Sequence, residues 1–484
     1  MTKPHQPWYI RREMPTDVQK VHLIGVAGAG MGAFACMLQE AGFEVRGSDL
    51  NVYPPMSDVL RSRGISWFEG WHADHLGWGP DLVIVGNVCR RDNPESVAAH
   101  EGGLATVSFP QALSDLFLRS RHPVVISGTH GKTTTTALTT WLLHAGGLQP
   151  GMLVGGVTHN FDATYLIGSE GGPFVVEGDE YDTAWFDKGP KFLHYRAQTC
   201  VLNNIEFDHA DIYDDLAEII ENFERLMGQL GPRTHLLANV DDPLVVERAQ
   251  LARGRVTYYG FGPGASLRAV DEAPEGAGFA FTLVKDNREL GRIVSPLAGR
   301  HNIWNTLAAF GVGLELGLSV AQLSQALAGF TGVKKRQEEK GEASGVLVVD
   351  DYAHHPTAIA ETLRALKARY AGRRLWAIYE AKSNTARRNV HQQAYAEAFD
   401  AADQVVFARP YIKKDNLADE EKLDVDQLVA DIESRGASAI YRATVEEIIE
   451  HLVEHAQAGD VVVFMSSSGF GGIHQRTLDA LAAR

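Results

Sequence analysis

Short runs of apolar residues recur along the chain, and most are followed by a turn and by a longer segment of mixed apolar and polar residues. These runs lie at residues 21–26, 81–86, 124–126, 173–177, 199–203, 345–350, 374–379, 404–407 and 460–464. Apolar runs without an alternating polar face are typical of strands buried on both faces of a parallel sheet. The alternation of such strands with helical segments predicts an α/β fold.

Two segments depart from this pattern. Residues 266–294 are rich in glycine and alternate only weakly. We expect antiparallel strands there, without catalytic chemistry. Residues 1–20 show no clear period and are expected to form an irregular extension, to which we assign no function.

Residues 124–136 combine one apolar run with a glycine turn and a threonine-rich helix start. Backbone N–H groups at a helix start, a lysine and a threonine hydroxyl are the groups that bind nucleotide phosphates and Mg²⁺ in phosphate-binding loops. The loop is shortened, because Ile126 occupies the position of the usual first glycine. A glycine-rich turn that binds nothing explains this composition poorly. The predicted ATP-binding residues are Gly128, Thr129, His130, Gly131, Lys132, Thr133 and Thr134.

A second glycine-rich loop follows the apolar run that ends at Val26. Gly28, Gly30 and Ala33, with Asp49 about twenty residues further on, imitate the fingerprint of a dinucleotide-binding loop. The same geometry can bind any diphosphate attached to a ribose, including that of a UDP-sugar. Alone, this loop leaves both a nicotinamide-dependent oxidoreductase and a UDP-sugar-binding domain open.

Two further strands are predicted to bring metal ligands to the phosphate loop. One ends at Glu177, and the next leads to His209. In an open α/β sheet, the carboxyl ends of the strands face the crevice that holds the ligand. Glu177 and His209, with Thr133, are therefore predicted to hold Mg²⁺, although His209 could also cap a helix. The solvated-loop interpretation is favoured for Glu180, Asp182 and Asp211.

Composition and charge exclude several classes of protein. Cys36, Cys89 and Cys200 are few, odd in number and far apart, which fits neither a disulfide framework nor a zinc site and predicts a reducing cytoplasm. No stretch approaches the roughly 20 apolar residues of a membrane span, and the polar N-terminus is not typical of a secretory signal. The formal charge of −16 argues against nucleic-acid binding. Anionic substrates must then be bound by local loops, lysines and metal.

The length and the motifs predict three domains. A chain of 484 residues corresponds to about three domains of ordinary size. A strand at 345–350 leads into a segment with two aspartates and two histidines, and a serine- and glycine-rich loop at 466–472 precedes the last helix. We expect a Rossmann-like domain, a central P-loop ATPase-type α/β domain and a second Rossmann-like domain, at residues 1–121, 122–330 and 331–484.

Taken in this order, the motifs resemble those of the Mur ligase family. The matching segments lie at residues 28–31, 128–134, 177–180, 203–209, 301–302, 332–336 and 350–356. The resemblance covers nearly the whole chain after residue 20. It implies that the three domains bind a UDP-sugar, ATP and an incoming amine. It also implies that a carboxylate of a UDP-muramyl substrate is activated by ATP as an acyl phosphate, which the amine converts into an amide.

The resemblance further implies roles for individual residues. Lys132 and Thr133 would contact the β- and γ-phosphates and Mg²⁺, with Glu177 and His209 as metal ligands. Asn302 would contact the adenine of ATP and Asp351 its ribose. Arg336 would contact the γ-phosphate, and His354 would lie beside the transferred phosphoryl group. The implied UDP-binding residues are Gly28, Ala29, Gly30, Met31 and Asp49. Some members carry a carbamylated lysine shortly after the position of His209, but residues 210–230 contain no lysine, so no carbamate is expected.

The amine donor is the least determined feature. The segment 350–356 is shared with members that add L-alanine, whereas 186–188, 380–385 and 467–475 resemble members that add the murein tripeptide L-alanyl-γ-D-glutamyl-meso-diaminopimelate to UDP-N-acetylmuramate in cell-wall recycling. A tripeptide with several carboxylates needs a donor-rich pocket. Its predicted contacts are Ser383, Asn384, Arg387, Arg388 and Gly471. Alternatively, the two arginines belong to a solvated helix face.

Two interpretations from other classes are disfavoured. A nicotinamide-dependent oxidoreductase would need a hydride-transfer site, which the sequence does not offer. A non-catalytic nucleotide-binding module would not need Lys132, Glu177 and His209 together. The sequence therefore predicts a ligase that uses ATP and Mg²⁺.

Overall fold

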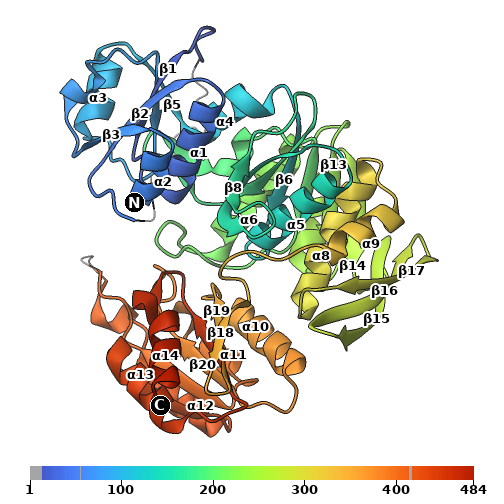
Figure 1. The fold of residues 1–484 in the computed structure, drawn as a ribbon. Helices are drawn as coiled ribbons and strands as arrows, with labels where there is room; N and C mark the ends of the chain where they lie inside the picture. Colours follow the sequence, from blue (N-terminus) through green and yellow to red (C-terminus); the bar gives the residue numbers. More distant parts are fainter. Residues whose placement is uncertain (1–12, 55, 414–416) are drawn as a thin grey trace. The chain divides into compact units, whose positions relative to one another are not determined.

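The computed structural model describes residues 13–54, 56–413 and 417–484 (Figure 1). The chain divides into two compact units. The first unit comprises the chain up to residue 206 together with 216–268 and 307–326, and the second comprises 207–215, 269–306 and 327–484. Residues 1–12 of the expected N-terminal extension lie outside the described residues. Residues 13–19 form neither helix nor strand.

The first unit begins with a five-stranded parallel sheet in the order β3-β2-β1-β4-β5. Its strands are β1 (Lys20–Ile24), β2 (Glu44–Asp49), β3 (Ser66–Glu69), β4 (Leu82–Val85) and β5 (Ala105–Ser108). The helices that connect or follow them are α1 (Ala29–Glu40), α2 (Met56–Ser62), α3 (Pro94–Glu101) and α4 (Phe109–Leu113). The strand order reverses at β1, which places the loop between β1 and α1 where a Rossmann-like sheet binds its ligand.

The second sheet has ten strands, and those around the phosphate loop follow the order β15-β14-β13-β12-β6-β9-β7-β8. They are β6 (His122–Ser127), β7 (Gly151–Thr158), β8 (Ala163–Leu166), β9 (Pro173–Gly178), β12 (Thr199–Leu202), β13 (His235–Asn239), β14 (Arg255–Gly260) and β15 (Leu267–Glu275). A small antiparallel pair consists of β10 (Asp182–Ala184) and β11 (Asp187–Pro190). Strand β6 lies between β9 and β12 and is parallel to both. The carboxyl ends of these three strands therefore meet at one edge.

The helices of this region are α5 (Lys132–Ala145), α6 (Leu216–Gln229), α7 (Pro243–Ala249), α8 (Arg300–Glu315) and α9 (Val320–Ala328). The antiparallel strands expected at 266–294 are present as β16 (Gly278–Lys285) and β17 (Arg288–Ser295), which pair antiparallel in the second unit. The start of β15 instead pairs parallel with β14. The weak alternation of apolar and polar residues in this segment did not predict that β15 pairs with β14.

The second unit contains a six-stranded sheet in the order β18-β19-β23-β20-β21-β22, coloured orange to red in Figure 1. Its strands are β18 (Glu338–Ala343), β19 (Val346–Asp351), β20 (Leu375–Tyr379), β21 (Gln404–Ala408), β22 (Ser438–Arg442) and β23 (Val461–Met465). Only β18 is antiparallel to its neighbour. The helices are α10 (Pro356–Arg369), α11 (Gln392–Ala398), α12 (Val425–Ser434), α13 (Val445–His455) and α14 (Ile473–Ala482).

Alternate residues of this sheet pack into two separate cores. Val349 of β19 belongs to a cluster with α10, α11 and α12, whereas its neighbour Val348 belongs to a cluster with α13 and α14. Because both faces are covered, the strands consist of continuous apolar runs, as the sequence pattern predicted. The α/β fold with parallel sheets is therefore confirmed. No helix among the described residues has the length and apolar character needed to cross a bilayer.

Candidate active site

The phosphate loop leaves β6 and enters α5 through two glycines with positive φ. Gly128 has φ 129°, and Gly131 has φ 81° and precedes the first residue of the helix. A Cβ atom at position 128 would lie 3.0 Å from the backbone nitrogen of Asn204, so a larger residue would displace the neighbouring strand end. The loop therefore presents the N-terminus of α5, where backbone N–H groups and the helix dipole favour an anion.

The segment after β12 holds this loop in place. Asn204 accepts the Thr129 backbone N–H with its carbonyl (3.1 Å) and the His130 N–H with its Oδ1 (2.7 Å). The Thr129 hydroxyl donates to the Glu206 carbonyl (3.2 Å) and accepts the Glu206 N–H (2.9 Å). Asn203, which belongs to the same segment, accepts the Tyr259 hydroxyl at 2.6 Å. Side-chain and backbone contacts thus fix the loop before any nucleotide binds.

Lys132 is anchored inside the loop by a buried ion pair. Its Nζ donates to the Gly128 carbonyl at 2.8 Å and lies 2.7 Å from Glu180 Oε2. Burial lowers the pKa of Lys132, but the carboxylates of Glu180, Asp179 and Glu177 raise it by more, so this pKa lies above its ordinary value. Glu180 is only 1% exposed. The expectation that it is a solvated loop residue is wrong, because sequence spacing could not reveal its ion pair with Lys132.

The other two acidic residues of that expectation are closer to the surface. Asp182 is half-buried and forms an ion pair with the exposed Lys188 at 2.7 Å. Asp211 is exposed and accepts a hydrogen bond from Asn384 at 2.8 Å. Asp211 is therefore exposed, as expected for a residue of a solvated loop, but its carboxylate also accepts a hydrogen bond from a specific side chain.

Glu177 is the last residue but one of β9 and lies beside the loop, with Ile126 opposite it in the neighbouring strand. Its Oε2 accepts the Gly155 N–H at 3.1 Å, and the Thr133 hydroxyl also hydrogen-bonds its carboxylate. Its Oε1 is buried and has no hydrogen-bond partner among the described residues. Burial raises the pKa of Glu177. A buried carboxylate oxygen without a donor, next to a threonine hydroxyl, fits a divalent cation with oxygen ligands.

In the second unit, a buried aspartate organises the histidines near β19. Asp208 is 5% exposed and accepts the His209 N–H at 2.7 Å, and its Oδ2 lies 3.9 Å from His354 Nε2. Burial raises the pKa of Asp208, but His209, His354 and His355 outweigh this effect and hold the pKa far below its ordinary value. His209 itself has φ 58°. It lies seven residues before α6 and does not cap that helix.

His354 and Arg336 lie at the carboxyl end of β19. The His354 carbonyl accepts the hydroxyls of Tyr379 (3.0 Å) and Tyr395 (2.7 Å), so two buried tyrosines fix its backbone. The Arg336 guanidinium lies 4.6 Å from the ring centroid of Tyr352. Positive φ angles at both neighbours of Arg336 (60° at 335 and 49° at 337) show that the chain is forced into this turn.

The side chains of Asp351 and Asn302 already form hydrogen bonds within the protein. Asp351 accepts the backbone N–H groups of Gln337 and Ala353, each at 2.7 Å, and burial raises its pKa although Arg336 opposes the shift. Asn302, in the first turn of α8, donates to the Ala298 carbonyl at 2.8 Å and is 7% exposed. Their predicted contacts to ribose and adenine stay predictions.

The first glycine-rich loop presents exposed backbone at the start of α1. Gly28, Ala29 and Gly30 are exposed, whereas the Met31 side chain is 8% exposed and packs into the core. The two oxygens of Asp49 accept the N–H groups of residues 27 (2.9 Å) and 50 (2.8 Å). Only the backbone of Met31 is therefore available to a ligand, and Asp49 stabilises the loop itself.

The predicted peptide-binding residues form a connected loop after β20. Asn384 Oδ1 accepts Arg387 at 3.3 Å, and the Thr385 hydroxyl accepts the Ala210 N–H at 3.0 Å. Arg387 is 5% exposed and lies in a turn, so the solvated-helix interpretation is wrong for it. Arg388 is half-buried, and its Nη1 lies 3.8 Å from Glu421 Oε1. Ser383 accepts the Ala386 N–H at 3.0 Å.

Gly471 lies in a separate turn, directly before α14. Its φ is 60°, and that of the following glycine is 70°. A Cβ atom at position 471 would lie 3.4 Å from a methyl group of Val445, which leaves no steric reason for glycine other than the backbone angle. Gly471 therefore lies in a turn in the structure, and its contact with a peptide stays a prediction.

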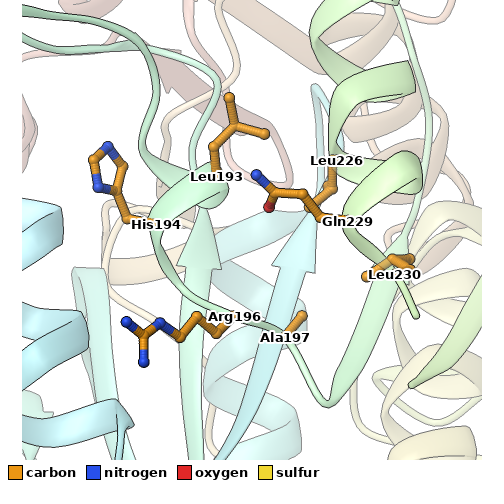
Figure 2. A pocket seen from close by; sticks show the side chains of 7 residues that line it. All are labelled: Leu193, His194, Arg196, Ala197, Leu226, Gln229 and Leu230. Atoms are coloured by element: carbon orange, nitrogen blue, oxygen red, sulfur yellow. The ribbon is translucent and has the colours of Figure 1, made fainter. Parts of the chain in front are cut away.

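A cavity of about 400 Å³ lies elsewhere in the first unit and contains none of the predicted site residues. Figure 2 shows side chains from residues 193–197 on one side, and on the other side chains from the end of helix α6 and from Leu230 just after it. The lining residues are Leu193, His194, Arg196, Ala197, Leu226, Gln229 and Leu230.

Three family models match the chain one after another. They are the Mur ligase family, catalytic domain, over residues 20–121, the Mur ligase middle domain over 126–313, and the Mur ligase, glutamate ligase domain, over 335–468. Together they span almost all of the chain after β1 begins.

Known proteins resemble the chain over most of its length. The UDP-N-acetylmuramate–L-alanyl-γ-D-glutamyl-meso-2,6-diaminoheptandioate ligase of Escherichia coli is 37% identical, over 96% of this chain and 99% of that protein. The crystal structure of a murein peptide ligase from Psychrobacter arcticus matches with a TM-score of 0.71 and 34% identity, over 96% and 99% of the two chains. The UDP-N-acetylmuramate–L-alanine ligase of Rubrobacter xylanophilus is 36% identical, over 81% of this chain and 84% of that protein.

Proposed function

The chain belongs to the Mur ligase family, and we propose that it joins L-alanyl-γ-D-glutamyl-meso-diaminopimelate to UDP-N-acetylmuramate at the expense of ATP. The observation that carries this proposal is the similarity, over 96% of the chain, to the Escherichia coli ligase that is named for these substrates. The L-alanine ligase of Rubrobacter xylanophilus matches 81% of the chain, so free L-alanine is the second candidate donor. We assign the reaction to murein recycling in the cytoplasm.

The proposed reaction has two steps, and the protein contributes mainly positioning and charge. A carboxylate oxygen of the muramyl group attacks the γ-phosphorus of ATP, the bond to the β-phosphate oxygen breaks, and ADP leaves. The amine of the L-alanyl residue then attacks the acyl carbon, phosphate leaves, and the amine loses a proton as the amide forms. We place UDP-sugar binding in residues 1–121, ATP binding in 122–330 and amine binding in 331–484.

The phosphate loop supports the first step. We infer that Lys132 contacts the β- and γ-phosphates when ATP is bound, because its ammonium lies inside the loop at the start of α5. Thr133 and the Glu177 Oε1 atom would hold Mg²⁺, which neutralises charge on the phosphates when bound. Gly128, Gly131 and the backbone of 129–130 would bind the phosphates through N–H groups.

We also propose roles for individual residues of the second unit. Arg336 would contact the γ-phosphate, and His354, oriented by two tyrosines, would lie beside the transferred group. His209 is proposed as a further metal ligand whose backbone Asp208 restrains. Asn302 and Asp351 are proposed to bind the nucleoside.

Release of ADP or phosphate tests the proposal directly. Wild-type protein is supplied with ATP, Mg²⁺ and UDP-N-acetylmuramate, and receives the tripeptide or L-alanine in parallel. We expect phosphate release that requires both the UDP-sugar and an amine, with a much higher kcat/KM for the tripeptide. A preference for L-alanine would overturn the donor assignment, and release without any amine would overturn the ligase itself.

A further inference from the structure

Two oppositely charged side chains lie in the loop that follows β20. Strands β20 and β23 are parallel neighbours, with Tyr379 opposite Met465, and Glu380 N–H donates to the Met465 carbonyl at 3.1 Å. Glu380 and Ser466 therefore leave the sheet side by side at its carboxyl edge. Open α/β sheets bind their ligands at this edge.

The Glu380 carboxylate is held rigidly through one oxygen only. Its Oε2 accepts the hydroxyls of Ser466 (2.6 Å) and Ser468 (2.9 Å), and its side chain is 14% exposed. Lys335 Nζ donates to the Ser468 carbonyl and so fixes the serine loop from the other side. Among the described residues, none donates a hydrogen bond to Oε1, and the Lys382 Nζ lies 4.0 Å from it. The second oxygen therefore has a fixed position and no close donor.

The Lys382 ammonium also lacks a close hydrogen-bond partner among the described residues. It lies 3.9 Å from the ring centroid of Tyr411, and no hydrogen bond from Nζ to a described residue is present. Its side chain is 30% exposed. Charge-assisted N–H···O bonds are about 2.7–2.9 Å long, so 4.0 Å leaves both charges short of a full partner. The two groups are close enough to bind one ligand that carries both opposite charges.

The tripeptide has one such place. The alanyl carboxyl, the glutamyl amine and the near amine of diaminopimelate are all used in peptide bonds. Only the distal carbon of diaminopimelate carries both a free ammonium and a free carboxylate. We propose that Glu380 binds this ammonium and Lys382 this carboxylate, as a specificity subsite for an amino-acid end of the donor that is remote from the reacting amine.

The proposal rests on the ligase function above and explains why free L-alanine would be a poor donor. Its single amine must attack the acyl phosphate, so an alanine bound in the subsite could not react. The tripeptide separates the two roles, because one amine reacts while the distal centre is bound.

Glu380→Gln tests the ammonium contact, since the amide oxygen can still accept the two serine hydroxyls. The donors are the tripeptide and an analogue that lacks only the distal amine, and KM and kcat are measured for each. We expect Glu380→Gln to raise KM for the tripeptide about tenfold or more, with kcat nearly unchanged and the KM of the analogue within about twofold. Lys382→Met is tested in the same way with a tripeptide that contains L-lysine, which lacks the distal carboxylate.

The matched control is Glu433→Gln, an exposed glutamate on α12, which should alter neither KM. An equal rise in KM for both donors would contradict the proposed subsite. Glu380 would then have only a structural role, in connecting its own loop to the serine loop. If the Glu380→Gln variant does not fold, the proposal is tested on the wild type. Equal KM values of the wild type for the tripeptide and both analogues would contradict the proposal. Absence of any tripeptide-dependent phosphate release by the wild type would instead mark failure of the proposed function.

Discussion

At the scale of single residues, the phosphate loop is organised by a largely buried pair of opposite charges. Lys132 and Glu180 have side chains that are 14% and 2% exposed and lie 2.7 Å apart. Such a pair contributes little net stability compared with apolar residues, but removal of one partner leaves a buried charge that is costly. The pair therefore holds the lysine ammonium at a fixed place in the loop, and the glutamate compensates its charge. We propose that this place suits a phosphate of ATP.

This arrangement separates the catalytic and structural roles of Lys132. We expect Lys132→Met to lower kcat/KM by orders of magnitude and the free energy of unfolding by roughly 3–5 kcal/mol, because Glu180 is left unpaired. Lys132→Met combined with Glu180→Gln should recover most of the stability and none of the activity. Denaturant unfolding and phosphate release measure the two effects. Near-normal turnover in either variant would contradict the assignment of Lys132.

Glu177 offers a second prediction at this scale. Its buried Oε1 has no donor among the described residues, and burial raises its pKa. In EDTA, Glu177→Gln should therefore be at least as stable as the parent, because the variant no longer buries an uncompensated charge. The same variant should need far more Mg²⁺ for half-maximal phosphate release. If its Mg²⁺ dependence equals that of the parent, other groups hold the ion.

At the scale of elements, apolar periodicity was a good guide and polar contacts were not. The strand runs predicted β6, β9, β12 and β19 because strands that are buried on both faces must be apolar throughout. The position of Glu177 at a strand end followed from the same rule. The roles of Asn204, Glu206 and Asp208 were missed as individual residues, because each depends on a contact with a distant loop. Their only signal was a polar motif directly after a strand.

The loop after β20 shows the same limit and leads to a third prediction. Thr385 accepts the Ala210 N–H at 3.0 Å, which joins this loop to the segment that carries His209. Thr385→Val removes the acceptor and keeps the shape, so we expect a loss of about 0.5–1.5 kcal/mol in the free energy of unfolding and a raised KM for the tripeptide. Thr282→Val, at a half-buried position in β16, is the matched control. Equal effects of both variants would show that this hydrogen bond has no special role.

At the scale of the whole molecule, the order of the motifs indicated more than any single motif. Gly28 and Gly30 alone suit a dinucleotide or a UDP-sugar, and a shortened phosphate loop alone suits many nucleotide-binding proteins. Their succession over nearly 500 residues, followed by the segment around Asp351, predicted the family that the three domain models match. The amine donor could not be derived from the order of the motifs, because the predicted peptide-binding residues make side-chain contacts that the sequence does not show, such as that of Asn384 with Asp211.

The ligand of the first glycine-rich loop is testable on the intact protein. Asp49 uses both carboxylate oxygens on backbone N–H groups, so it is poorly available for the ribose hydroxyl that such an aspartate binds in NAD sites. We therefore expect UDP-N-acetylmuramate, and not NADH, to raise the melting temperature. At 100 times its Kd, a ligand that binds only the folded state adds about 2.7 kcal/mol. Stabilisation by NADH alone would restore the oxidoreductase interpretation.

A glycine variant makes this assignment specific to the loop. A Cβ atom at Gly30 would meet nothing within 4 Å, so Gly30→Ala fits the free protein and should stabilise α1 slightly, because alanine is the better helix former. The added methyl group lies on exposed backbone where a diphosphate would approach. Gly30→Ala should therefore abolish most of the stabilisation by UDP-N-acetylmuramate. Gly228→Ala, at an equally open position in α6, should retain it. Full stabilisation of the Gly30 variant would place the UDP-sugar elsewhere.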